Sequence, residues 1–270
     1  MDGSYGCRWL PVVAFFVAYP AWPQAQSTVA SVEPLTADPA SYVPSGHRPG
    51  NVVTYPIQPP TPEEKGDAYM LHKSYQAAIE AYTKIEQPSA AVWNKTGIAY
   101  QMMFDLKDAA RCYKESLKLE PDNSHTLNNL ATVEESQGDF SGAERNYKKS
   151  LRLNSRSAIV WQNLGTTLLL QHQFGRGTDA YAQALAIDPH IFDTHPGPTV
   201  TAPAATRERG TTSYFKARTC ARAGFTDCAL SHLRKAFNEG FATVKTVANE
   251  VDFDSLRGKP EFESLLAEQK

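Results

Sequence analysis

The sequence is poor in cysteine, in net charge and in long apolar runs, and each shortage excludes a class of protein. Four cysteines with no C-x-x-C pair give no pattern of a zinc site or a redox motif. A formal net charge of −2 gives no electrostatic basis for binding nucleic acid or an acidic membrane surface. The apolar run from Leu10 to Trp22 is well short of the ~20 residues that span a bilayer.

Sequence patterns of common catalytic sites are also missing. The chain contains no G-x-S-x-G, no G-x-x-x-x-G-K-[ST] and no H-E-x-x-H. His190, Asp193 and His195 lie close together, but a zinc site needs three or four defined ligands and no further partner follows at helical spacing. We therefore expect no enzymatic activity, no bound metal and no cofactor.

The N-terminal segment, residues 1–27, is typical of a secretory signal peptide. Arg8 precedes the apolar run, and Ala25-Gln26-Ser27 offers the small residues that a signal peptidase reads. We expect export to the periplasm or the extracellular space, with no membrane span after cleavage. The alternatives are a mis-assigned start or a buried apolar end, which would leave the protein in the cytoplasm. The proline-rich residues 28–60 should form an extended or disordered linker.

A repeat with a period of 34 residues organises the chain from position 90 to position 189. Large, small, small and aromatic residues recur in phase, and a fixed period of this size indicates a stacked repeat architecture. The matching positions are Trp93, Leu127 and Trp161; Gly97, Ala131 and Gly165; Ala109, Ala143 and Gly177; and Tyr113, Tyr147 and Tyr181.

This pattern resembles the tetratricopeptide repeat. The resemblance implies an all-α fold, a right-handed α-solenoid of antiparallel helix hairpins, because one hairpin cannot bury its apolar face alone. We expect four hairpins over residues 61–189, the first of them shortened. Thr61, Pro62 and Glu64 are typical of a capped helix start. Gly177, which replaces an alanine, should make its helix start late or fray.

The C-terminal third should contain three further parts. We expect a flexible loop over 190–210, a fifth and weaker hairpin over 211–240, and a helical cap over 241–270. The cap resembles the segment that closes many bacterial tetratricopeptide arrays. Cys220 and Cys228 lie eight residues apart across a predicted turn and would suit a disulfide in an exported protein; two buried free thiols are the alternative.

Polar residues also recur at the 34-residue period, on the first helix of each regular hairpin. In this family those helices line the concave side of the stack, so these side chains would form ladders along a groove. An amide offers donors and an acceptor, and can therefore bond the backbone of an extended peptide. The alternative is that the amides are solvated or bond to neighbouring helices. The candidate residues are Asn94 and Lys95, Asn128 and Asn129, and Gln162 and Asn163.

These observations predict a non-enzymatic scaffold for protein–protein interaction. It would hold a partner's peptide or helix in the concave groove and help to assemble a complex in the cell envelope. Glu63 and Asp67 in the first unit do not fit the carboxylate clamp of the chaperone-binding members. The alternative function is an accessory subunit of an envelope enzyme or secretion machine, which would dock through the 190–210 loop.

Overall fold

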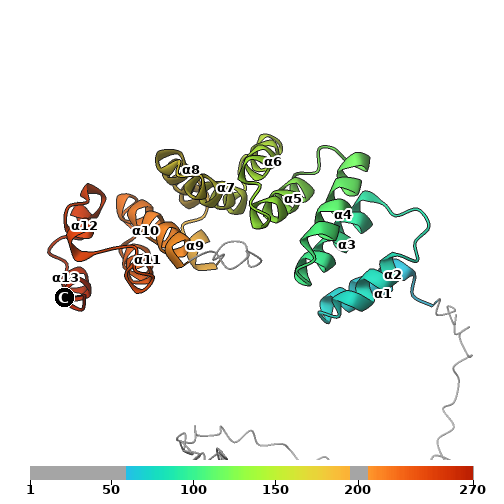
Figure 1. Ribbon diagram of the computed structural model, residues 1–270, viewed down its shortest axis with the longest axis horizontal. Helices are drawn as coiled ribbons and strands as arrows, with labels where there is room; N and C mark the ends of the chain where they lie inside the picture. The colour runs from blue at the N-terminus through green and yellow to red at the C-terminus, as the bar shows by residue number, and fades with distance from the viewer. Residues whose placement is uncertain (1–58, 195–205, 270) are drawn as a thin grey trace, which may run out of the picture. The chain divides into compact units, whose positions relative to one another are not determined.

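The computed structural model describes residues 59–194 and 206–269, and this part of the chain contains helices and turns but no strand (Figure 1). The predicted signal peptide and nearly all of the predicted linker lie outside the described residues. The first eight helices pair into four hairpins, as predicted. They are α1 (Pro62–Leu71) with α2 (Tyr75–Tyr82), α3 (Ala90–Met102) with α4 (Leu106–Leu119), α5 (Ser124–Ser136) with α6 (Phe140–Leu153), and α7 (Ala158–Leu170) with α8 (Phe174–Ile187).

The hairpins stack through regular contacts between neighbours. The second helix of each hairpin packs on the first helix of the next, as α4 does on α5 and α6 on α7. First helices also touch one another, α3 with α5 and α5 with α7. Each hairpin thus buries its apolar side against the next, and the described residues form the all-α solenoid that the period predicts.

The repeated small residues are explained by the repeated tyrosines. A Cβ atom added at Gly97 would lie 2.6 Å from the ring of Tyr113, and one added at Gly165 would lie 2.4 Å from the ring of Tyr181. Tyr113, Tyr147 and Tyr181 are fully buried. The ring therefore occupies the space where the two helices of a hairpin approach, and a larger residue there would push them apart.

The helix starts follow local sequence rules with one correction. Thr61 and Glu64 form a capping box around Pro62, and Asp105 caps α4 through the backbone N–H of Asp108. Our prediction for Gly177 was wrong, because α8 begins at Phe174, in phase with α4 and α6. A Cβ atom at Gly177 would lie 2.7 Å from the Leu169 side chain, so the close packing of α7 and α8 favours glycine there.

The segment predicted as a flexible loop is helical at both of its described ends. A short helix, α9 (Ile191–Thr194), follows the fourth hairpin, and α10 (Thr206–Arg222) begins before the predicted fifth hairpin. The physical reason is burial: Ile191 and Phe192 are each 2% exposed, and Phe192 packs edge-on against Tyr181. The sequence between the two helices lies outside the described residues.

The C-terminal part contains the predicted fifth hairpin and cap. Helix α10 pairs with α11 (Thr226–Asn238), and a disulfide joins Cys220 on α10 to Cys228 on α11. The cap consists of α12 (Val244–Ala248), the 3-10 helix η1 (Val251–Leu256) and α13 (Pro260–Ala267). Phe253 and Phe262 from the cap are buried in the same apolar cluster as Tyr214 of α10. None of the helices in the described ranges has the length and apolar character needed to cross a bilayer.

Candidate interaction surface

Side-chain amides on the first helices form a continuous chain of hydrogen bonds across three hairpins. Asn163 on α7 donates to Oδ1 of Asn128 on α5 over 3.2 Å. Asn128 donates to Oδ1 of its neighbour Asn129 over 3.4 Å, and Asn129 donates to Oδ1 of Asn94 on α3 over 3.2 Å. We call these four residues the amide chain. The alternative raised by the sequence, amides that bond to neighbouring helices, is therefore what the structure contains.

All hydrogen bonds of the amide chain run in one direction, and this direction determines which donors and acceptors are left for a ligand. The Oδ1 atoms of Asn94, Asn128 and Asn129 all accept from within the protein, and Asn94 accepts a second bond from the Thr126 hydroxyl. Within the described ranges, no acceptor is bonded to the Asn94 amide nitrogen, and Asn128 and Asn129 each use one N–H. An amide nitrogen carries two N–H groups, so the half-buried outer part of the chain presents spare donors.

The α7 end of the predicted ladder is closed, which corrects the sequence-based expectation. Gln162 is 0% exposed and Asn163 is 4% exposed, so neither lines an open surface. Asn94, Asn128 and Asn129 are half-buried and remain reachable. The period places all these residues on the same helix face, but it does not record how far a neighbouring hairpin covers that face.

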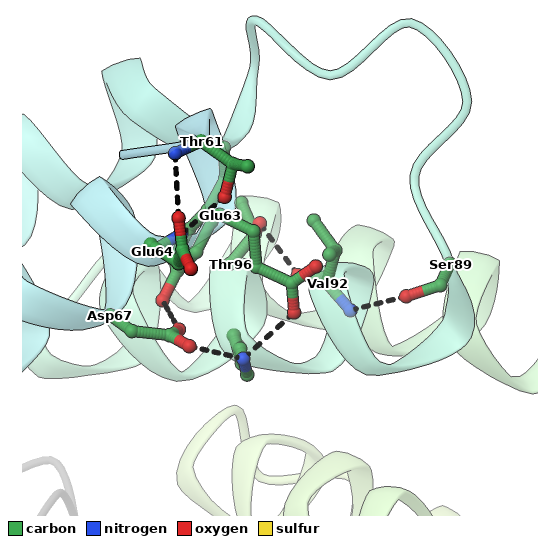
Figure 2. A network of polar contacts seen from close by, with 9 residues as sticks. Thr61, Glu63, Glu64, Asp67, Ser89, Val92 and Thr96 are labelled. Carbon is green, nitrogen blue, oxygen red and sulfur yellow. Dashed lines mark hydrogen bonds and ion pairs between the residues drawn. The ribbon is translucent and has the colours of Figure 1, made fainter. Parts of the chain in front are cut away.

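Lys95 is the one predicted binding residue that is not an amide, and it forms ion pairs with the first hairpin. Its Nζ atom lies 2.9 Å from Oε1 of Glu63 and 2.7 Å from Oδ2 of Asp67. Figure 2 shows Glu63 and Asp67 on the same side of α1, next to Thr61 and Glu64. Asp67 also accepts a hydrogen bond from the Tyr82 hydroxyl over 2.7 Å. Partial burial acts to raise the pKa of Asp67, but the hydrogen bonds from Lys95 and Tyr82 outweigh it and lower that pKa. Lys95 therefore joins two hairpins and offers little net charge to a ligand.

A pocket opens where the shortened first hairpin meets the second. Helix α2 has 8 residues whereas α4 has 14, so α2 leaves part of α3 uncovered. Trp93, next to Asn94 in the chain, is half-buried at this pocket. The lining is Tyr82, Thr83, Ile85, Glu86, Pro88, Val92, Trp93 and Thr96.

A buried carboxyl group lies at the seam between α5 and α7, although the sequence pair Glu134-Glu135 is most simply interpreted as a solvated face, and that interpretation is wrong for Glu135. Glu135 is 4% exposed, and burial raises its pKa to about 7. The Thr167 hydroxyl on α7 bonds to its Oε2 atom, while Oε1 is buried without a hydrogen bond. At the same repeat position stand Gln101 and Leu169, so the 34-residue period alone does not indicate a buried acid here.

Candidate metal sites are not supported in the described part of the chain. No group of three His, Cys, Asp or Glu residues there could hold a metal ion. The Nδ1 atom of His190 lies 3.9 Å from Oδ2 of Asp193, and both side chains are exposed. His195 lies outside the described residues.

The arrangement of paired helices at a 34-residue period defines a helical-repeat protein. The family model of the tetratricopeptide repeat matches residues 90–123, and a second tetratricopeptide-repeat model matches residues 124–157. The chain is therefore a tetratricopeptide-repeat protein, as its sequence pattern indicated. Such repeats generally act as non-enzymatic modules of protein–protein interaction, and the assignment supports that role for this chain.

Among solved structures, the chain is similar in part to MamA. A crystal structure of MamA has 17% identity and a TM-score of 0.47, and the match covers 68% of this chain and 97% of that chain. MamA AMB-1 has 19% identity and a TM-score of 0.47, with 70% and 96% covered. A comparison with curated proteins found no match.

Proposed function

We propose that this protein is an interaction scaffold that binds an extended segment of a partner polypeptide along the first helices α3 and α5. The observation that carries the proposal is the direction of the amide chain. Its oxygens are occupied inside the protein, and its spare N–H donors lie on half-buried residues of two neighbouring hairpins. Backbone carbonyl oxygens of an extended segment are acceptors that repeat along a chain, so they match such a row of donors.

The pocket beside Trp93 complements these polar contacts. Aromatic residues in partly buried pockets are the usual anchors of protein interfaces. The pocket lined by Tyr82, Val92 and Trp93 would receive an apolar side chain of the partner while the amide chain holds its backbone.

The scaffold is proposed to act in the bacterial cell envelope and to help assemble a complex there. Two features support this location. Residues 1–27 have the pattern of a secretory signal. The disulfide between Cys220 and Cys228 is typical of proteins that fold in an oxidising compartment.

The test uses Asn94→Asp, which removes the two amide N–H donors of that side chain and keeps Oδ1. The bonds from Thr126 and Asn129 to that oxygen can therefore persist. Purified wild-type and variant proteins would be cross-linked to polypeptides of an envelope extract, and each captured polypeptide would be quantified. We expect a specific partner to be lost with Asn94→Asp and kept with Asn154→Asp, which makes the same charge change at an exposed residue outside the amide chain.

Thermal unfolding of both variants separates binding from folding. The proposal requires the Asn94→Asp protein to unfold near the wild-type temperature while its partner is lost. Equal capture by wild type and Asn94→Asp, with all proteins folded, would exclude the amide chain as the binding surface.

A further inference from the structure

Glu135 occupies a position where its carboxylate form lacks partners. Its side chain lies on α5 against α7, is 4% exposed, and takes part in none of the ion pairs found among the described residues. In the preceding hairpin the equivalent residue, Gln101, accepts a 2.7 Å bond from the Tyr113 hydroxyl. The corresponding phenol near Glu135 is Tyr147, and its hydroxyl is paired with Thr132 at 3.1 Å.

Counting hydrogen atoms shows which form of Glu135 fits the site. The Thr167 hydroxyl has one hydrogen but faces two acceptors, Oε2 of Glu135 and the main-chain oxygen of Asn163 at 3.1 Å. If Glu135 is protonated, its O–H donates to Thr167, and Thr167 donates to Asn163. If Glu135 is ionised, both acceptors compete for one hydrogen and Oε1 remains buried without a donor.

The surroundings supply no positive charge that would offset ionisation. Helix α7 has no titratable side chain, and the titratable groups that face Glu135 from α6 and α8 are the phenols of Tyr147 and Tyr181. The neighbouring Glu134 is engaged by Asn146 of α6 and influenced by Lys114 of α4. Arg145 of α6 acts on Glu134, and Lys148 of α6 and Arg176 of α8 both pair with Glu144.

We propose that the seam between α5 and α7 is proton-linked, so that Glu135 holds a proton while the third and fourth hairpins are stacked and releases it when the seam opens. The hydrogen count and the burial of an unpartnered oxygen carry this proposal. It makes the rigidity of the array depend on pH, because separating the hairpins exposes the carboxyl group to water.

The direction of the effect follows from proton binding in the two states. Burial raises the pKa of Glu135 from 4.5 to about 7, so in this interval the opened chain binds fewer protons than the stacked one. The stabilisation is complete below pH 4.5 and is lost as the pH rises through 7. In this interval the unfolding constant should rise by about tenfold per pH unit through this one group.

Two measurements test the proposal. The first is an NMR titration of the Glu135 side-chain carboxyl carbon in the wild-type protein, where we expect a midpoint near pH 7. The second compares chemical unfolding of wild type and Glu135→Gln from pH 4.5 to 8. The amide N–H can donate to Thr167 as the protonated acid does, so the variant should keep its stability as the pH rises. The matched control is Glu80→Gln, which changes an exposed carboxylate on α2.

The outcomes are distinct. A carboxyl midpoint near pH 7, together with a stability difference between Glu135→Gln and wild type that grows toward pH 7, supports the proton-linked seam. A midpoint near 4.5 overturns it whether or not the variant folds. A wild type and a folded Glu135→Gln protein that lose stability in parallel also overturn it.

Discussion

Asn163 on α7 donates its amide N–H to Oδ1 of Asn128 on α5, 3.2 Å away and 35 residues earlier in the chain. The bond crosses the seam between the third and fourth hairpins. Asn129 makes the equivalent bond to Asn94 one hairpin earlier, also over 3.2 Å. Residues that the period placed on a binding face thus also hold the repeats together.

Removing the buried donor of this pair should destabilise the stack. Asn163→Ala deletes the bond to Asn128 and leaves a polar cavity, because Asn163 is 4% exposed. We expect a loss of about 1–3 kcal/mol in the free energy of unfolding. Urea unfolding measures it, with Asn154→Ala as the exposed control, expected within about 0.5 kcal/mol of wild type. Equal stability of both variants would show that the inter-hairpin amide bond contributes nothing.

Two helical glycines should respond in opposite directions to the same substitution. Gly165→Ala places a Cβ atom 2.4 Å from the Tyr181 ring, and we expect overpacking to cost about 1–3 kcal/mol. Gly175→Ala meets nothing within 4 Å on α8 and should add up to about 1 kcal/mol through helix propensity. Thermal unfolding of the two variants and the wild type measures both effects. A Gly165→Ala protein as stable as the wild type would contradict the packing of the Tyr181 ring on Gly165.

The fifth hairpin should depend on its disulfide. Because Cys220 and Cys228 close a short loop, reduction is expected to cost roughly 2–3 kcal/mol. The measurement is unfolding with and without reductant, compared with a Cys220→Ser/Cys228→Ser protein that should be insensitive to reductant. Cys112 should not confuse the result: it is buried, and burial raises the pKa of its thiol to about 11, so it should resist alkylation in the folded protein.

His232 on α11 should be replaceable by an apolar ring. Both of its ring nitrogens are buried without a hydrogen bond, and burial lowers its pKa to about 3. Its ring packs edge-on against Phe192, 5.8 Å between centroids. We expect His232→Phe to be neutral or stabilising, whereas His232→Ala should cost roughly 2–5 kcal/mol through the cavity it leaves. Strong destabilisation by phenylalanine would indicate a polar role for the imidazole.

The period of 34 residues predicted the hairpins because it encodes the spacing of helices. It fixed which residues start each helix, and α3, α5 and α7 begin at Ala90, Ser124 and Ala158, each 34 residues apart. Helix capping follows equally from the sequence, because it is short-range. The side chains of Thr61 and Asp105 each accept a hydrogen bond from the backbone N–H three residues later.

Burial within the candidate site was not predictable in the same way. Asn94, Asn128 and Gln162 occupy equivalent positions, yet Gln162 is fully buried and the other two are not. Their exposure depends on the packing of other elements, which a period does not record. The burial of Glu135 was not predictable for a related reason, because its neighbours Thr167 and Tyr181 are more than 30 residues away in sequence.

The most direct test of the interaction surface is photo-cross-linking from two matched sets of positions. A photoreactive amino acid would replace Ala91, His125 or Ile159, which are exposed on the first helices α3, α5 and α7. The control set is Lys107, Ser141 and Gly175, which are exposed at the same period on the second helices. The account predicts that the partner cross-links at Ala91 and His125 and not at the control positions. Cross-linking confined to the second helices would contradict it.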